Sequence, residues 1–213
     1  PNLGVSFTRK AKERKSEMKK WLTPLLLLLF IGGCAMPETR VYSLYLSKDR
    51  EGTIHPKGDA SIVIVINAPR YLTQPYIVYR KSPYQFEISR YSKWEASPNE
   101  MLRRVFKDNL SSTQRFKEVK VINIVPEGFY SLKINLKRFE RSDMGNDSFG
   151  ELVFDVQLLS PDGKELFQNT ISKKSKLDDR TFLSLAKGLS GALQEGVDEV
   201  RDNIDRSLKG NKF

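Results

Sequence analysis

The sequence predicts an α+β fold, in which two helices pack on one face of a mostly antiparallel sheet. Three patterns predict this class. Residues 130–137 and 152–158 alternate apolar and polar side chains, as antiparallel strands with one buried face do. Residues 62–66 are five consecutive β-branched apolar residues, which indicates a strand covered on both faces. Residues 98–110, and those from beyond Asp179 to about Leu208, carry apolar side chains at helical spacing.

A short strand and a loop are expected ahead of the buried strand at residues 61–67, "SIVIVIN". In residues 41–46, "VYSLYL", alternation places Tyr42, Leu44 and Leu46 on one face of a strand. Residues 47–60 are rich in Gly, Pro and charged side chains, which predicts a loop.

A β-hairpin and a capped helix follow the buried strand. Residues 76–80 and 84–90 are rich in β-forming side chains and flank a Lys81-Ser82-Pro83 turn. Ser97 is then expected to be an N-cap, with Pro98 at the first helical position and Glu100 completing a capping box. Trp94, just ahead of this helix, is expected to anchor it to the sheet. The apolar face of the helix is predicted to consist of Met101, Leu102, Val105, Phe106 and Leu110.

The C-terminal half is expected to contain strands joined by polar connections and a long closing helix. Residues 119–125 predict a strand, closed by Pro126-Glu127-Gly128. The polar residues 141–150 predict an exposed loop between the two alternating strands, and Ser160-Pro161-Asp162-Gly163 predicts a turn into a strand at 166–172. Asp178-Asp179 is expected to cap the last helix. Three glycines in that helix indicate either close packing on the sheet or a bend: Gly188, Gly191 and Gly196.

The apolar run "LLLLLFIGGC" indicates export of the chain. Its apolar stretch, Trp21 to Ile31, is too short for a bilayer span, which needs roughly 20 residues. Cationic residues precede it and small residues close it, which is the layout of a secretory signal peptide. Ile31-Gly32-Gly33-Cys34 resembles the bacterial lipobox, which implies cleavage between Gly33 and Cys34 and diacylglycerol transfer to the Cys34 sulfur. The alternative is an ordinary signal peptide with an incidental cysteine.

These features divide the chain into four parts. Residues 1–17 are interpreted as an over-extension upstream of a start at Met18, the alternative being a genuine long basic n-region. Residues 18–33 are the lipoprotein signal peptide, 34–40 an acylated tether, and 41–210 a single domain. Residues 1–33 hold seven Lys or Arg and two Asp or Glu, so half of the formal net charge of +10 precedes Cys34. The remaining excess could favour anionic head groups, an acidic partner or no specific partner, and export argues against nucleic acid.

The sequence offers no set of catalytic or metal-binding residues. His55 is the only histidine and lies in the predicted loop, so neither a triad nor a histidine metal site can be assembled around it. Gly163-Lys164 lacks the upstream glycine of a phosphate-binding loop. Aromatic and basic residues interleave around Arg80 and Lys93, but in an exported chain packing explains them better than binding of single-stranded nucleic acid. We therefore expect no enzyme activity, no metal and no cofactor.

Residues 68–112 resemble the ABC-type transport auxiliary lipoprotein family, which includes the paraquat-inducible protein C type. The resemblance lies in the order of features rather than in one strict motif, and the lipobox and closing helix extend it over the mature chain. Gln74 departs from the pattern, because a charged residue is more usual there. The matching residues are Pro69, Tyr71-Leu72, Pro75, Ile77-Val78, Arg80, Trp94, Ser97-Pro98, Leu102 and Asn109-Leu110-Ser111.

The resemblance implies a non-enzymatic subunit of an ABC/MCE-type envelope lipid (phospholipid) transport system. Its partners would be a periplasmic protein with mammalian-cell-entry (MCE) domains and, through it, an inner-membrane ABC permease and ATPase. Tyr71, Tyr76 and Arg80 are the candidate partner-binding residues, and a ring-forming homo-oligomer is allowed by analogy. Ala35 is not the aspartate of an inner-membrane retention signal, so we expect the acyl chains to anchor the domain to the periplasmic face of the outer membrane. The alternative is a structural or assembly lipoprotein, such as a lipopolysaccharide-transport-like plug or a surface-binding module.

Overall fold

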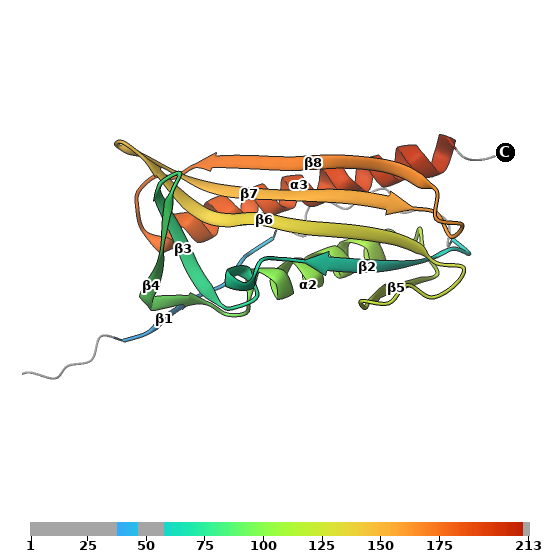
Figure 1. Ribbon diagram of the computed structural model, residues 1–213, viewed down its shortest axis with the longest axis horizontal. Coiled ribbons are helices and arrows are strands. Elements are labelled where there is room, and N and C mark those ends of the chain that lie inside the picture. Colours follow the sequence, from blue (N-terminus) through green and yellow to red (C-terminus); the bar gives the residue numbers. More distant parts are fainter. Residues whose placement is uncertain (1–37, 47–57, 211–213) are drawn as a thin grey trace, which may run out of the picture. The chain divides into compact units, whose positions relative to one another are not determined.

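Two helices cover one face of a mixed sheet in the computed structural model, which describes residues 38–46 and 58–210 (Figure 1). The predicted α+β class, with both helices on the same face, is confirmed. We call the other face of the sheet the open face, because no described helix packs on it. The predictions for Gly33, Cys34 and His55, and for most of the loop at 47–60, lie outside the described residues.

The elements follow one another as a series of strands interrupted and closed by helices. The strands are β1 (Arg40–Tyr42), β2 (Ser61–Asn67), β3 (Tyr76–Ser82), β4 (Gln85–Trp94), β5 (Glu118–Val121), β6 (Tyr130–Met144), β7 (Asp147–Leu159) and β8 (Glu165–Lys176). The helices are the 3-10 turn η1 (Arg70–Leu72), α2 (Pro98–Ser112) and α3 (Phe182–Gly210). No helix in the described part of the chain is long and apolar enough to cross a membrane.

Strand β6 is the spine of the sheet. One edge of β6 pairs with β7, which in turn pairs with β8, and both of these long ladders are antiparallel. The other edge is shared by two parallel strands in succession: β2 lies opposite the first half of β6, with Ile62 facing Tyr130, and β3 lies opposite the second half, with Tyr79 facing Arg141. The chain leaves this edge through η1 between the two. As a result, β3, β4 and β1 extend the sheet beside one half of β6, and β5 extends it beside the other.

The buried strand was predicted correctly. Strand β2 lies between β5 and β6 and is parallel to both. The consecutive residues Ile62, Val63 and Ile64 are all completely buried, so side chains on both faces of this strand are shielded from solvent, and both of its edges are paired. Such burial explains the uninterrupted run of β-branched residues.

Helix α2 begins at the predicted Ser97 N-cap, but the Glu100 side chain does not complete the predicted capping box, because its carboxylate lies toward Arg104. The Ser97 hydroxyl accepts a hydrogen bond from the Glu100 backbone N–H at 3.2 Å, and Pro98 is the first helical residue. The Glu100 carboxylate lies near Arg104, at 3.8 Å. Phe106, on the buried face of the helix, packs edge-on against Phe154 of β7 with ring centroids 5.8 Å apart.

Trp94 ends β4 three residues before α2 and packs in the core. Only 1% of its surface is exposed, and its ring meets Phe139 of β6 edge-on at 5.4 Å. The side chain therefore fixes the point where the chain passes from the sheet into α2, in agreement with the anchoring role expected for it.

Helix α3 starts at a different cap from the one predicted. The Thr181 hydroxyl accepts the Ser184 N–H at 3.2 Å, so Thr181 is the capping residue. Asp179 supports this cap by accepting from the Thr181 N–H at 2.8 Å and from its hydroxyl at 2.6 Å. The hydrogen bond from Thr181 lowers the pKa of Asp179. The prediction of an aspartate cap was wrong because the helix starts three residues after Asp179, within reach of the threonine.

The apolar stripe of α3 packs on β7 and β8. A Cβ at Gly188 would lie 2.6 Å from Leu177 Cδ2, and one at Gly196 would lie 3.2 Å from the Phe154 ring. These two glycines therefore mark close packing, the first of the two explanations left open by the sequence. The stripe is buried at Leu185, Leu189, Ala192, Leu193, Val197, Val200 and Ile204.

The exposed loop predicted at residues 141–150 was wrong. Strand β6 continues to Met144 and β7 begins at Asp147, so a tight turn at Gly145, with φ +61°, joins two paired strands. Arg141 is only 7% exposed. It forms an ion pair with Asp143 at 3.0 Å, and Asp143 in turn accepts from the Ser148 hydroxyl at 2.6 Å. Because these polar groups bind one another, they can be buried without the apolar alternation that normally indicates a strand.

Two predicted strands are shorter than expected. Only Val41 and Tyr42 of the segment 41–46 lie in a strand, β1, although the even-numbered side chains of the segment are half-buried against the core, as the alternation predicts. Strand β5 stops at Val121, before Ile124, which is 79% exposed. The β2–β5 ladder ends at Ile64 and Val121. Beyond it, the Arg103 side chain donates to the Ile66 carbonyl of β2 at 3.1 Å, in place of a backbone N–H from β5.

Candidate partner-binding surface

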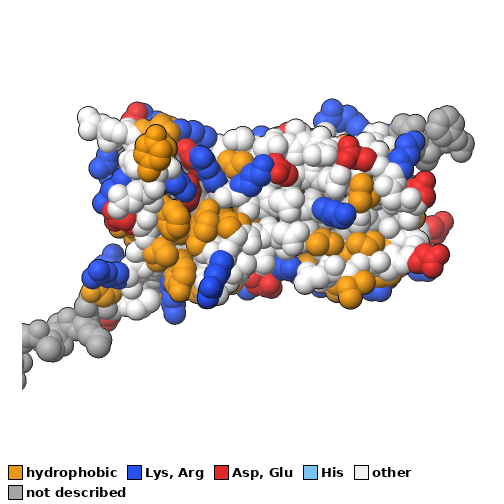
Figure 2. Space-filling model, viewed as in Figure 1, with side chains coloured by type: hydrophobic (Ala, Val, Ile, Leu, Met, Phe, Trp, Pro, Cys, Tyr) orange, Lys and Arg blue, Asp and Glu red, His pale blue; other side chains and the backbone are white. Residues whose placement is uncertain are grey.

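Three aromatic side chains gather on the open face where η1, β3 and β4 meet. We call Tyr71, Tyr76 and Phe86 the aromatic patch. Tyr76 and Phe86 are each 41% exposed, and the Tyr71 and Phe86 rings stack with centroids 5.0 Å apart. Tyr71 and Tyr76 also line a depression of about 530 Å³ together with Arg70 and Gln74. Figure 2 shows hydrophobic side chains concentrated over this end of the sheet.

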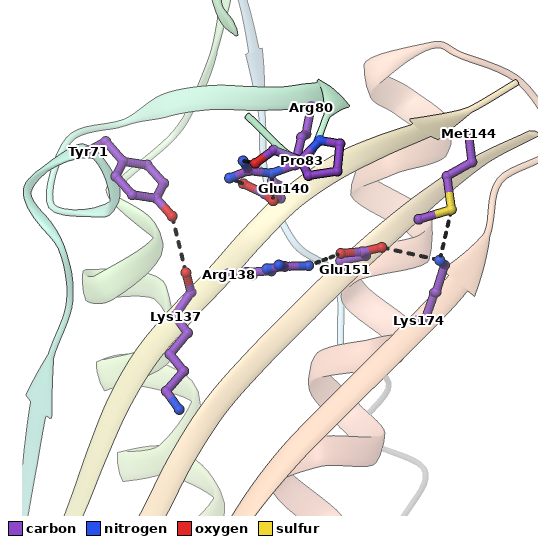
Figure 3. Close-up of polar contacts among 9 residues, drawn as sticks. All are labelled: Tyr71, Arg80, Pro83, Lys137, Arg138, Glu140, Met144, Glu151 and Lys174. Carbon is purple, nitrogen blue, oxygen red and sulfur yellow. Dashed lines mark hydrogen bonds and ion pairs between the residues drawn. The ribbon is translucent and has the colours of Figure 1, made fainter. Parts of the chain in front are cut away.

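The short η1 turn explains how Tyr71 reaches the surface. Leu72 is completely buried, whereas the neighbouring Tyr71 lies over the open face. Its hydroxyl donates to the Lys137 carbonyl at 3.1 Å (Figure 3). The ladder between β6 and β7 shifts register at this point, between Leu136 and Arg138, so Tyr71 binds a backbone oxygen at an irregular position. Burial raises the pKa of the Tyr71 phenol.

Arg80 holds a buried carboxylate rather than projecting freely from the surface. Its Nε donates to Glu140 Oε1 at 2.7 Å and its Nη2 to Glu140 Oε2 at 3.2 Å, while Nη1 donates to the Pro83 carbonyl at 3.3 Å. Glu140 is completely buried, and the hydrogen bond to it raises the pKa of Arg80. The guanidinium also lies 5.6 Å from the Phe86 ring centroid. The structure thus brings together the three residues predicted from the sequence, with Arg80 as support for the patch.

A second buried carboxylate extends this arrangement across the sheet. Glu151 of β7 lies directly opposite Glu140 of β6 and is 6% exposed. Arg138 binds its Oε2 at 2.9 Å, and Lys174 of β8 binds its Oε1 at 3.3 Å (Figure 3). Each of the two facing carboxylates thus has its own cationic partner, Arg80 for Glu140 and Arg138 with Lys174 for Glu151, so neither buried charge is unpaired.

Phe86, Glu140 and Glu151 also belong to this surface, although the sequence did not predict them as members of it. A usable signal was present in Arg138 and Glu140, because these charged residues alternate with the apolar Phe139. Their phase is shifted by one position relative to Lys133 and Lys137, which is what the bulge between Leu136 and Arg138 produces. The partners could not be identified, since Glu140 is 60 positions away from Arg80.

The interleaved aromatic and basic residues at 79–81 bind within the protein. The Tyr79 hydroxyl donates to Glu87 at 2.6 Å, and Lys81 forms an ion pair with the same carboxylate at 2.8 Å. The hydrogen bond from Lys81 lowers the pKa of Glu87 most, and the bond from Tyr79 lowers it further. On the helix-covered face, the Arg141 guanidinium lies 5.0 Å from the Tyr79 ring centroid and 5.3 Å from that of Phe182, at the start of α3. The patch is thus built on a rigid end of the sheet.

Within the described ranges, no three His, Cys, Asp or Glu side chains come together as metal ligands. The Gly163-Lys164 pair belongs to the turn between β7 and β8, where Gly163 has φ +85° and its N–H donates to the Ser160 carbonyl at 2.9 Å. This is the hairpin geometry expected from the sequence.

A family match identifies the class of this protein. Residues 42–201 match the family described as ABC-type transport auxiliary lipoprotein component, and the chain belongs to that family. The predicted resemblance is therefore confirmed, and with it the classes lipoprotein and transport auxiliary component.

Solved structures support the fold. The crystal structure of protein XCC0632 from Xanthomonas campestris matches with a TM-score of 0.66 and 17% identity, covering 81% of this chain and 99% of that one. A crystal structure of an uncharacterized protein matches with a TM-score of 0.57 and 20% identity, covering 78% and 99%. At these identities the likeness extends to the fold alone. A comparison with curated proteins gives no match.

Proposed function

We propose that the chain is a non-enzymatic, outer-membrane-anchored lipoprotein subunit of an ABC/MCE-type envelope lipid transport system, and that it docks the periplasmic MCE component. The aromatic patch is the observation that carries the docking role. Family membership supports a part in ABC-type transport, and the lipobox resemblance at Cys34 supports the anchor.

The patch has the composition of a protein interface. Tyrosine, phenylalanine and arginine are enriched at interfaces, where large rings bury much area with little loss of conformational freedom. Tyr71 is held by its hydroxyl and Arg80 by Glu140, so these side chains are already ordered before a partner arrives. Preorganisation of this kind lowers the entropic cost of association.

The proposal divides the work between subunits. This chain supplies an anchor and a docking surface, while the inner-membrane permease and ATPase supply the energy. Stable anchoring needs more than one acyl chain, and the diacylglycerol expected on Cys34 meets that need. The domain then holds one end of the lipid conduit at the periplasmic face of the outer membrane.

Co-purification tests the docking role. The wild-type protein, extracted in mild detergent after light crosslinking, is expected to bring down an MCE-domain protein. The double variant Tyr76→Ala, Phe86→Ala is expected to lose that partner, because it removes the two most exposed rings of the patch. Tyr45→Ala is the control for loss of an exposed ring outside the patch. The Tyr45 side chain is 82% exposed, and its backbone N–H donates to the Ser190 hydroxyl of α3.

Each outcome is decisive. Absence of an MCE protein from the wild-type preparation would contradict the proposed system, and recovery of an outer-membrane barrel protein in its place would favour the assembly alternative. Loss of the partner from Tyr45→Ala but not from the double variant would contradict the patch as the docking site.

A further inference from the structure

The length of the tether limits how far the domain can be from the membrane. Strand β1 begins at Arg40, six residues after Cys34. Even fully extended, six residues span about 20 Å, which is less than half the length of a 15-residue strand such as β6. This step rests on the acylation of Cys34 in the proposed function. If it holds, the edge of the sheet that starts at β1 stays beside the bilayer surface.

The side chains at this edge have the character of a membrane interface. We call Arg40, Val41, Arg90, Tyr91 and Lys93 the tether edge; all five are exposed, Val41 by 56% and Tyr91 by 51%. Strand β1 pairs only with β4 among the described strands, with Arg40 opposite Ser92 and Val41 opposite Lys93. The five residues thus come from two neighbouring strands at one margin of the sheet.

The three cations of the tether edge remain available to an outside anion. Arg40, Arg90 and Lys93 form no ion pair with another residue in ranges 38–46 and 58–210. The two nearest acids along β4 are both engaged elsewhere: Glu87 binds Lys81 at 2.8 Å, and Glu95 lies 3.9 Å from Arg104. Glu38, exposed two residues before Arg40, offsets part of this charge, but three cations against one nearby free carboxylate still leave a local positive excess in the described ranges.

A lipid surface fits the tether edge better than a protein strand does. Strand β1 has three residues, and charged side chains on so short an edge oppose the addition of another strand. Anionic head groups attract Lys and Arg, and tyrosine favours the boundary between head groups and hydrocarbon, where its ring and hydroxyl are both satisfied. We propose that the tether edge rests on the membrane that carries the acyl anchor and binds its anionic lipid head groups.

This contact would orient the domain. With β1 against the bilayer, the sheet stands on its edge, so neither the open face nor the helix-covered face lies against lipid. The aromatic patch, on the open face, remains accessible to a partner approaching from the periplasm. Tyr76 of the patch pairs with Lys93 of the tether edge in the β3–β4 ladder, so membrane contact and docking use adjoining parts of the same sheet.

A fluorescence experiment on the acylated protein tests the contact. Cleavage before Cys34 removes Trp21, so the mature chain has Trp94 as its one tryptophan, and Trp94 is 1% exposed. Tyr91→Trp protein is placed in vesicles of phosphatidylethanolamine and phosphatidylglycerol containing brominated lipid. The new indole is expected to be quenched, and Val41→Trp is a second reporter in case the first variant is unstable. The control is Ile124→Trp, which lies 79% exposed after β5 and is expected to stay unquenched.

Charge variants test the head-group contact. Binding of the unacylated Cys34→Ser chain to phosphatidylglycerol vesicles is expected to fall by about five-fold for each of Arg40, Arg90 and Lys93 changed to Gln. The matched control changes three exposed lysines elsewhere, and it is expected to bind as the parent does. The control positions are Lys107, Lys133 and Lys164.

The outcomes separate this inference from the proposed function. Failure of the acylated chain to stay with vesicles would contradict the anchor itself. Retention of the chain with no quenching at positions 91 and 41 would overturn the membrane contact and leave the anchor standing. Equal loss of binding in both triple variants would overturn the specific role of the tether edge.

Discussion

Glu140 is enclosed entirely by the protein, although it lies on the face of the sheet that no described helix covers. Its two oxygens are bound by the Arg80 guanidinium, which brings a charge from β3 to β6. A buried carboxylate is tolerated only while such a partner is present, because water cannot replace it. The pair therefore ties the β3–β4 hairpin, and with it Phe86, to the spine of the sheet.

Removing the arginine should cost much more stability than removing the neighbouring lysine. Arg80→Ala is expected to lower the free energy of unfolding by about 3 kcal/mol, because it leaves Glu140 buried and unpaired. Lys81→Ala is the control: Lys81 is 59% exposed in its pair with Glu87, and exposed pairs contribute about 0–1 kcal/mol. Urea denaturation of both variants measures the difference. Equal, small losses in the two would show that Glu140 is not held as described.

Replacing both members of the buried pair provides an internal check. The double variant Arg80→Met, Glu140→Leu removes the charge together with its partner, so much of the loss in Arg80→Ala is expected to be recovered. A double variant as unstable as Arg80→Ala would point to lost packing by the arginine stem, rather than to the unpaired carboxylate, as the cause.

Asp155 should make stability depend on pH in the acid range. Lys137 donates to the Asp155 carboxylate at 2.7 Å, and the Thr170 hydroxyl donates to it at 2.8 Å. The bond from Lys137 is the main cause that holds the pKa of Asp155 below its ordinary value, and the bond from Thr170 adds to it. The folded state thus binds its proton less readily than the unfolded state, whose pKa is about 3.9. The contribution of Asp155 to stability is present above that pH and is lost as the pH falls through the lower, folded pKa.

The measurement compares wild type with Asp155→Asn by urea denaturation over a series of pH values. The difference in unfolding free energy between them is expected to be constant above about pH 5 and to shrink below about pH 4. Asp108→Asn, at an exposed position on α2, is the reference substitution of the same kind. A difference that grows as the pH falls would contradict the sign of the shift.

At the scale of the elements, helix α3 offers the same substitution in two environments. Alanine is favoured over glycine inside a helix by up to about 1 kcal/mol. At Gly191 a Cβ would meet nothing within 4 Å, so Gly191→Ala is expected to raise the free energy of unfolding by most of that amount. At Gly188 the Cβ would lie 2.6 Å from Leu177, so Gly188→Ala is expected to forfeit the gain. Thermal and urea unfolding rank the two, and equal gains would show that Leu177 moves aside freely.

The elements that could be predicted from the sequence are those whose pattern is local. The β-branched run of β2, the Ser97-Pro98 start of α2 and the apolar stripe of α3 each carry their signal within one segment. The strand ends around Gly145 could not be predicted, because Arg141 is satisfied by groups distant in sequence, including the backbone of Arg180 at the start of α3. When these partners are not known, the polar residues 141–150 look like those of an exposed loop.

The same limit applies to the candidate site. Tyr71 and Tyr76 could be predicted because family resemblance and local sequence mark them. Phe86 could not, since its place in the patch depends on a stack with Tyr71 across the fold and on Arg80 held by Glu140. Sequence periodicity assigns a residue to a face of a strand, but the neighbours on that face are fixed by strand order, which here brings β3 beside β6.

In the molecule as a whole, the arrangement of strands gives three surfaces. The helices occupy one face, the aromatic patch lies on the open face, and the tether edge lies at the margin where β1 joins β4. The patch adjoins the tether edge, because Tyr76 pairs with Lys93, so a domain resting on a bilayer through this edge would present the patch beside the membrane surface. The acylation of Cys34 in the proposed function is the condition for this arrangement.

Replacing the anchor cysteine should therefore change where the protein is found without changing its domain. Cys34→Ser cannot form the thioether, and without acyl chains the protein loses about 0.8 kcal/mol of membrane binding for each CH₂ no longer buried. We expect the variant to leave the outer-membrane fraction, while the urea midpoint of the domain stays that of wild type, because the compact unit begins at Thr39. Gly32→Ala, which keeps a small residue ahead of the cysteine, is the control and should remain acylated. Fractionation and the intact mass of the mature protein provide the measurement, and a wild-type mass without acyl chains would refute the anchor.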